Sequence, residues 1–360
     1  MKILLIATGG TISQAHDEFG TAINAGTTTA DDFKTSLKAI PEKWNIDIET
    51  LPLLTKDSSN IVPADWDKII NTIVDKYDGY EAFLITHGTN TLGYTSAALS
   101  FALGGLGKPV ILTGSQVSYG EPGSDALMNL ENAIRVAHDR DDLKGVLAVF
   151  GSHIITGVRV KKTTEFEYDA FKTFSKTSSL GRIGRVLRWD EELLERHNRF
   201  MEPTARNMAE LDVKAKFDLS IVSLTEFPGL KWEFLKALVE AGAKGIIFRA
   251  TGAGDPNVAE PEADFENLRA GFEYLRQEEI PIVITTQAPD GIASMDVNDP
   301  GKMAFALGAI PAWDMSMEAM TVKLAWLLGR KLPYEEIRSL MSHSFRGEVE
   351  PRRGQKRGSN

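Results

Sequence analysis

The chain has 360 residues, of which 42% are hydrophobic and 25% are charged, so we expect a soluble globular protein with two domains or one large domain. The formal net charge of −10 argues against a nucleic-acid-binding surface spread over the whole protein. The absence of cysteine excludes a disulfide framework, a thiolate metal site and a cysteine nucleophile.

No apolar run approaches the roughly 20 residues that a membrane span needs, so no membrane association is expected. Residues 1–7 lead directly into a glycine turn without the pattern of a signal peptide. We therefore expect the protein to stay in the cytoplasm.

The first half of the chain alternates between strand-like apolar runs and helix-like stretches. Strands are expected at Lys2–Ala7, Ile46–Leu54, Ala82–Ile85, Pro109–Thr113 and Gly145–Phe150. Helices are expected at Asp65–Tyr77, Tyr94–Leu103 and Ser124–His138. This alternation predicts a parallel sheet that is covered by helices on both faces.

A second α/β set follows a polar, irregular stretch that includes some helix at Glu191–Asn198. Its expected strands are Leu219–Leu224, Gly245–Phe248 and Ile280–Thr285. Its expected helices are Trp232–Ala241, Asp264–Gln277, Pro300–Leu307 and Met317–Leu328. The sequence thus predicts an N-terminal domain at 1–190, a linker at 191–216, a C-terminal domain at 217–350 and a disordered basic tail at 351–360.

Two glycine-rich turns, one leading to Thr11 and one to Thr89, follow the first and third expected strands. Ligands of open α/β sheets bind at the carboxyl ends of the strands, and a threonine hydroxyl there can act as a nucleophile if a base takes its proton. Taken alone, the first turn is more often a plain connection. Thr89 and Asn90 can equally cap the helix that follows them.

Three further sites are ambiguous when each is taken alone. A lone lysine is usually solvated, but a desolvated one can be a general base, and spacing does not choose between Lys161 and Lys162. The segment 57–60 offers hydroxyl and N–H groups for a carboxylate, although a turn explains it as well. His87 has no partner at metal-ligand spacing, so we expect a structural histidine and no metal site.

Taken together, these segments resemble the L-asparaginase family, specifically its short cytoplasmic (type I) branch. The resemblance covers nearly the whole chain in order and spacing. The matching segments are TGGTI (8–12), DSSN with PADW (57–66), THGTNTLGYTSAALSFAL (86–103), GKPVILTGSQ (107–116), EPGSDALMNL (121–130), RVKKTTEFEYDAF (159–171), TGAG (251–254), ITTQAPDG (284–291) and GAIPAWDMSMEAMTVKLAWLLG (308–329).

The resemblance implies an α/β fold with a larger N-terminal domain, which has a flavodoxin-like, mostly parallel sheet, and a smaller C-terminal α/β domain. It also implies an amidohydrolase that converts the side-chain carboxamide of a small molecule to a carboxylate and ammonia through an acyl-enzyme. No metal or organic cofactor is implied. The family forms homodimers or homotetramers in which the C-terminal domain completes a neighbouring site.

Carried over position by position, the resemblance implies that Thr11 is the nucleophile and that Thr89 and Lys162 activate or position water. The distance to Asp169-Ala170-Phe171 selects Lys162 rather than Lys161. The remaining implied substrate-binding positions are Ser58 with Asp57 and Ser59 for the substrate's α-carboxylate, and Gly10, Gly88 and Ser115 for the amide and the forming oxyanion.

This sequence departs from the family pattern at positions that bear on which substrate is used. Asn90 stands where the family has an aspartate that joins the relay and binds the α-ammonium group, and Thr21 stands where a lid tyrosine supports the nucleophile. Asn298 stands where close relatives carry a lid-contacting tyrosine. We therefore expect an asparaginase-like enzyme whose substrate need not be free L-asparagine.

Four alternatives stay open at this point. The chain can be an ordinary L-asparaginase in which Asn90 is tolerated or slows turnover. It can be an amidotransferase subunit that feeds ammonia to a tRNA-linked partner, or a non-catalytic small-molecule binder. A dinucleotide-binding oxidoreductase is the least favoured, because the glycine fingerprint is missing.

Overall fold

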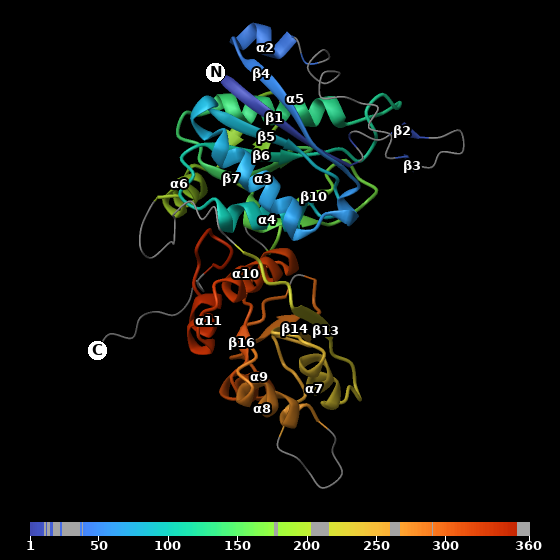
Figure 1. The fold of residues 1–360 in the computed structure, drawn as a ribbon, viewed down its shortest axis with the longest axis vertical. Coiled ribbons are helices and arrows are strands. Elements are labelled where there is room, and N and C mark those ends of the chain that lie inside the picture. The colour runs from blue at the N-terminus through green and yellow to red at the C-terminus, as the bar shows by residue number, and fades with distance from the viewer. Residues whose placement is uncertain are drawn as a thin grey trace. The chain divides into compact units, whose positions relative to one another are not determined.

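The computed structural model divides the chain into two compact units, Met1–Ala215 and Lys216–Asn360 (Figure 1). The described residues are 1–10, 12, 15–16, 22–23, 37, 39–175, 179–202, 216–259, 267–289 and 291–350. The expected tail 351–360 and the first residues of the expected helix Asp264–Gln277 lie outside them. Within these ranges, no helix combines the length and the apolar character that crossing a membrane requires.

The first unit is built on an eight-stranded, mostly parallel sheet, as expected. Its strands are β1 (Lys2–Gly9), β4 (Asp47–Lys56), β5 (Ala82–Thr86), β6 (Pro109–Thr113), β7 (Gly145–Phe150), β8 (His153–Thr156), β11 (Gly181–Ile183) and β12 (Leu187–Trp189). The strand order is β12-β11-β8-β7-β6-β5-β1-β4. Strands β4, β1, β5, β6 and β7 pair in parallel, whereas β8, β11 and β12 add an antiparallel edge.

Two short hairpins and five α-helices complete the description of this unit. The hairpins are β2 (Ala15–His16) with β3 (Ala22–Ile23), and β9 (Val160–Lys162) with β10 (Phe171–Thr173). The helices are α2 (Ala39–Trp44), α3 (Pro63–Asp75), α4 (Leu92–Ala102), α5 (Ala126–Asp139) and α6 (Glu191–Phe200). Short 3-10 helices lie at Ser58–Asn60, Tyr77–Gly79 and Gly157–Arg159.

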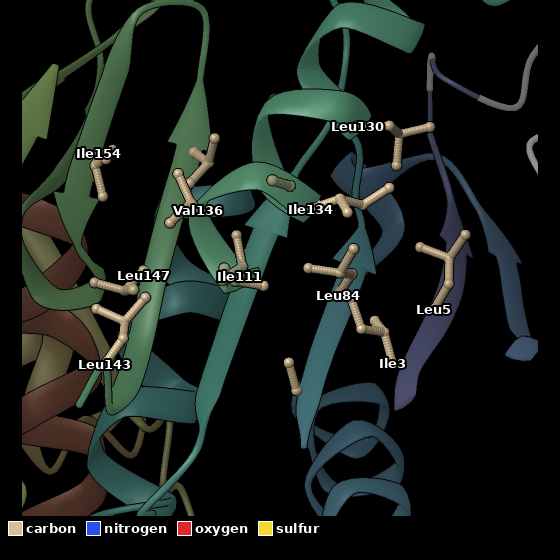
Figure 2. Close-up of a cluster of buried hydrophobic side chains, with 14 of the residues drawn as sticks. Ile3, Leu5, Leu84, Ile111, Leu130, Ile134, Val136, Leu143, Leu147 and Ile154 are labelled. Atoms are coloured by element: carbon tan, nitrogen blue, oxygen red, sulfur yellow. The ribbon is translucent and has the colours of Figure 1, made fainter. Parts of the chain in front are cut away.

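Helix α5 closes one face of the sheet. Figure 2 shows its Leu130 and Ile134 in one buried cluster with Ile3, Leu84 and Ile111 of the strands. Successive strand residues point to opposite faces, so the alternate apolar residues face the other side, where α3 and α4 lie. Both faces of the central strands are therefore buried, and polar groups of these strands concentrate at their ends.

The expected strand bounds are confirmed for β6 and β7, and the other expected strands of this sheet end one or two residues early. Strands β1 and β4 continue into the polar residues Thr8, Thr55 and Lys56, because ladder hydrogen bonds do not depend on apolar side chains. The short strands β8, β11 and β12 went unrecognised. Helix α6 occupies part of the segment expected as a linker, and its Leu194 packs into the core of the first unit.

The second unit has a four-stranded parallel sheet in the order β13-β14-β15-β16. Its strands are β13 (Ile221–Thr225), β14 (Gly245–Ala250), β15 (Ile282–Thr286) and β16 (Ile310–Pro311). Its helices are α7 (Glu233–Glu240), α8 (Arg269–Gln277), α9 (Asp299–Ala306), α10 (Met317–Gly329) and α11 (Tyr334–Met341). A smaller C-terminal α/β domain is thereby confirmed.

A buried ion pair fastens the segment after α11 to α10. Lys323 Nζ lies 2.7 Å from Glu348 Oε1, and both side chains are 0% exposed. Lys323 also donates to the carbonyl oxygen atoms of Met341 and His343, and the Glu348 carboxylate accepts from the backbone N–H groups of Phe345 and Arg346. The charges are tolerated in the core because each is hydrogen-bonded as well as paired.

We expect Glu348→Ala to lower the free energy of unfolding of the second unit by about 3–5 kcal/mol, because it leaves the Lys323 ammonium buried without its counter-charge. Differential scanning calorimetry measures this. The matched control is Glu335→Ala, which removes an exposed ion pair with Arg338 and should change stability by no more than about 0.5 kcal/mol. Equal effects of the two substitutions would contradict the conclusion that the buried Lys323–Glu348 pair holds this segment in place.

Candidate functional site

Two glycine turns touch where the parallel strands β1 and β5 end. Gly10 has a φ of +82°, and a Cβ atom at this position would lie 2.3 Å from the Cα of Gly88. Only glycine tolerates both the backbone conformation and the close approach. The contact joins the segment that leads to Thr11 to the segment that leads to Thr89.

The loop after β4 adds a third wall to this contact. A Cβ atom on Gly88 would lie 2.7 Å from Ser58 Oγ, and the Ser58 side chain is buried. The Asp57 side chain accepts a hydrogen bond from the Ser59 N–H at 2.8 Å and so caps the 3-10 turn that carries Ser58. Thr91 Oγ1 donates to the Ser58 carbonyl oxygen at 2.6 Å, which ties this loop to the start of α4.

A lysine and a threonine from distant parts of the sequence meet at the same place. Lys162 Nζ, on hairpin strand β9, lies 2.9 Å from Thr89 Oγ1 and 3.1 Å from Asn90 Oδ1. Thr89 is buried, whereas Asn90 is exposed. Neither side chain caps α4, whose N-cap is Thr91 without a side-chain capping bond. The capping alternative for Thr89 and Asn90 is therefore wrong.

The charged form of Lys162 fixes the orientation of the Asn90 amide in this cluster. An ammonium group has donors only, so the oxygen end of the amide must face Lys162. The nitrogen end then donates to Ser59 Oγ at 3.1 Å. Asn90 thus bridges the lysine and the loop after β4, a connection that was not foreseen from the sequence.

The pKa of Lys162 is lowered from its ordinary value, mainly because burial disfavours the charged ammonium. The carboxylate of Glu165 opposes this effect. Asn90 is uncharged and contributes no such compensation. The cluster therefore holds a lysine with an increased neutral fraction beside a threonine hydroxyl, which is the arrangement that proton transfer between the two groups requires.

Ser115 lies in the loop after β6 and is fully buried. Its Oγ has no hydrogen-bond partner among the described residues. The loop is held from α5: Asn129 Nδ2 donates to the Gly114 carbonyl oxygen at 2.9 Å, and the Asp125 carboxylate accepts from the Gln116 N–H at 3.0 Å. These two supports fall within the matched segment 121–130, but no sequence pattern singles them out.

Two of the predicted site residues, Thr11 and Thr21, lie outside the described residues. Asn298 belongs to the second unit, where its Nδ2 donates to Asp255 Oδ2 at 2.7 Å. In the part of the chain that the structure describes, no three histidine or acidic side chains are placed to hold a metal ion.

Hydroxyl, amide and ammonium groups thus converge at the carboxyl edge of a parallel sheet, as in small-molecule sites of α/β enzymes. Residues 2–194 match the family model described as "Asparaginase, N-terminal", and residues 220–341 match the "Glutaminase/Asparaginase C-terminal domain". The chain therefore belongs to the asparaginase family, and it is an amidohydrolase that acts on linear amides.

Individual relatives cover nearly the whole chain. L-asparaginase from Thermococcus kodakarensis is 35% identical over 97% of this chain and 99% of its own length. Its solved structure superposes with a TM-score of 0.82 at 32% sequence identity, covering 98% of this chain and 100% of that one. A glutamyl-tRNA(Gln) amidotransferase subunit from Aeropyrum pernix is 32% identical over 98% of this chain and 80% of its own length.

We expect Asn90→Asp to raise the pKa of Lys162, because it places a carboxylate where a neutral amide oxygen now lies 3.1 Å from the ammonium group. The pKa is measured by NMR titration after reductive ¹³C-methylation, with Lys162→Met used to assign the signal. Asn60→Asp adds the same charge to the neighbouring 3-10 turn without a bond to Lys162 and should leave this pKa nearly unchanged. A similar rise in both variants would mean that the contact is not made in solution.

Proposed function

We propose that the protein hydrolyses the side-chain carboxamide of a small molecule through a threonine ester. Thr11 Oγ attacks the amide carbon, its proton passes to a base, and the protonated amine departs as ammonia. Water then cleaves the ester and releases a carboxylate. The observation that carries the proposal is the 2.9 Å contact between Thr89 and a lysine whose pKa is lowered by burial.

In this proposal Lys162 is the base and Thr89 carries the proton between it and the attacking oxygen. The backbone around Gly10 and Gly88 and the buried Ser115 receive the amide and the oxyanion that forms on attack. The close packing of Gly10 on Gly88 supports this, because it brings the backbones of the two turns to one place.

The loop with Asp57, Ser58 and Ser59 is proposed to hold a carboxylate of the substrate, for which its hydroxyl and N–H groups are suited. The substrate class follows from Asn90. A hydrogen bond to a charged group contributes about 1.5–3 kcal/mol, and an amide paired with an ammonium lacks the charge that a carboxylate would offer. We therefore favour substrates that lack a free α-ammonium group, carry it acylated, or have a hydroxyl or carbonyl in its place. Thr21 in place of the lid tyrosine fits a wider or differently closed pocket.

An ordinary L-asparaginase is the second candidate, favoured by the 35% identity to the Thermococcus kodakarensis protein of that name. The similarity to an amidotransferase subunit supports a third, an ammonia-producing subunit that works with a tRNA-linked partner. A non-catalytic binder is the remaining alternative. In each case we expect a homodimer or homotetramer, which light scattering after gel filtration measures.

Ammonia release from a panel of amides tests the proposal, with Thr11→Ala as the blank. The panel contains L- and D-asparagine, L-glutamine, succinamic acid, N-acyl asparagines, β-asparaginyl peptides and simple primary amides. We expect Thr11-dependent turnover that is faster on succinamic acid or N-acyl asparagine than on L-asparagine. Preference for free L-asparagine would support the second candidate, and silence across the panel would favour a binder.

Asn90→Asp should raise kcat/KM for L-asparagine by about 10- to 100-fold, because the new carboxylate pairs with the α-ammonium group. The gain should appear as a lower KM rather than as a higher kcat. The same carboxylate raises the pKa of Lys162 and thereby moves the optimum of kcat to higher pH. Succinamic acid, which has the same carboxylate and amide but no ammonium, is the matched control and should gain nothing. An equal gain on both substrates would contradict this role of position 90.

A further inference from the structure

A chain of three hydrogen bonds runs from the interior of the first unit to the glycine turn after β5. Trp66 Nε1, on α3, lies 3.1 Å from Thr95 Oγ1, on α4. Thr95 Oγ1 lies 2.9 Å from His87 Nε2, and His87 Nδ1 lies 2.8 Å from the carbonyl oxygen of Gly88. The side chains of Trp66, Thr95 and His87 are all buried.

The two end groups of this series of hydrogen bonds fix the direction of every bond in the series. An indole N–H can only donate, so the Thr95 oxygen accepts from Trp66 and its single hydrogen is left for His87 Nε2. A carbonyl oxygen can only accept, so Nδ1 carries the imidazole hydrogen and donates to Gly88. Burial lowers the pKa of His87 to about 4, which keeps the ring neutral at ordinary pH.

The carbonyl oxygen of Gly88 and the N–H of Thr89 belong to the same trans peptide group and point in opposite directions. Because His87 holds the oxygen toward the interior, the Thr89 N–H is directed away from it. Among the described residues this N–H finds no backbone acceptor. It lies beside Thr89 Oγ1, which contacts Lys162, and next to the Gly88 backbone that packs on Gly10.

We propose that His87 is a positioning residue: held in one tautomer by Trp66 and Thr95, it aims the Thr89 N–H at the oxygen of the bound amide. The inference rests on the proposed function, because it assumes that an amide is attacked at this site. A donor that meets the oxygen as negative charge develops acts mainly in the transition state, so its alignment should appear in kcat rather than in KM.

Two substitutions test the contributions of the two ring nitrogen atoms of His87 separately. The amide nitrogen of His87→Asn falls near Nδ1 and can still donate to Gly88, whereas that of His87→Gln falls near Nε2 and reaches only Thr95. We expect His87→Asn to keep kcat within about threefold and His87→Gln to lose about 10- to 100-fold, with KM little changed in both. Thr95→Ser, which keeps the hydroxyl, should retain kcat, and Thr95→Val should lower it. Steady-state ammonia release from succinamic acid and L-asparagine is the assay.

Melting temperatures of the four variants distinguish positioning from support of the fold. A structural role alone predicts that kcat follows the melting temperature, so that His87→Asn and His87→Gln lose activity equally when equally stable. That outcome would overturn the proposal, as would an unchanged kcat in His87→Gln.

The bond directions are also tested without turnover, by NMR of ¹⁵N-histidine-labelled protein in which loss of a signal in His87→Asn assigns the ring. We expect a hydrogen on Nδ1 and a bare Nε2, and the reverse tautomer would overturn the proposal. If the wild-type protein hydrolysed no amide of the panel described above while the Nδ1 tautomer was found, the proposed function would fail and the hydrogen-bond chain would stand. The two failures are therefore distinguishable.

Discussion

The contact of Gly10 with Gly88 is the constraint on which the site depends. Two backbones meet at a distance that no side chain can enter, just beyond the paired ends of β1 and β5. Ser58 packs on the same glycine, so the loop after β4 is held at the same point. Neighbouring parallel strands deliver these segments to one edge, but the glycine contact determines how near they come.

The second characteristic of the site is that its lysine lacks a charged partner in direct contact. Lys162 is partly desolvated, and its nearest partners are a hydroxyl and an amide, neither of which carries a formal charge. Burial lowers the pKa of Lys162, and the charge of Glu165 opposes this effect. Elsewhere in the chain the opposite solution is used: Lys323 is buried completely, but directly against the carboxylate of Glu348. Burial lowers the pKa of both lysines, but Lys323 has a carboxylate in direct contact that opposes this effect, whereas the direct partners of Lys162 are uncharged.

Much of the fold was predictable because the central strands are buried on both faces. Runs such as Pro109–Thr113 are apolar up to their last residue, and their ends are marked by a change of residue type. The antiparallel edge strands were missed because three or four residues hold too little pattern. The site was predictable as a set of segments, through the family resemblance. The Asn90 bridge to Ser59 and the bonds around His87 were not, because ordinary side chains make them and no sequence pattern marks those side chains.

The bridge made by Asn90 changes what Ser59 has to offer. A carboxylate at position 90 would accept the hydroxyl hydrogen of Ser59, and that hydrogen would then be directed toward position 90. The amide nitrogen of Asn90 instead donates to Ser59 Oγ, so the serine oxygen is the acceptor and its own hydrogen is left for another acceptor. The replacement that removes a negative charge therefore also exchanges the donor and acceptor roles between positions 90 and 59, and it leaves the Ser59 hydroxyl free to donate to another group.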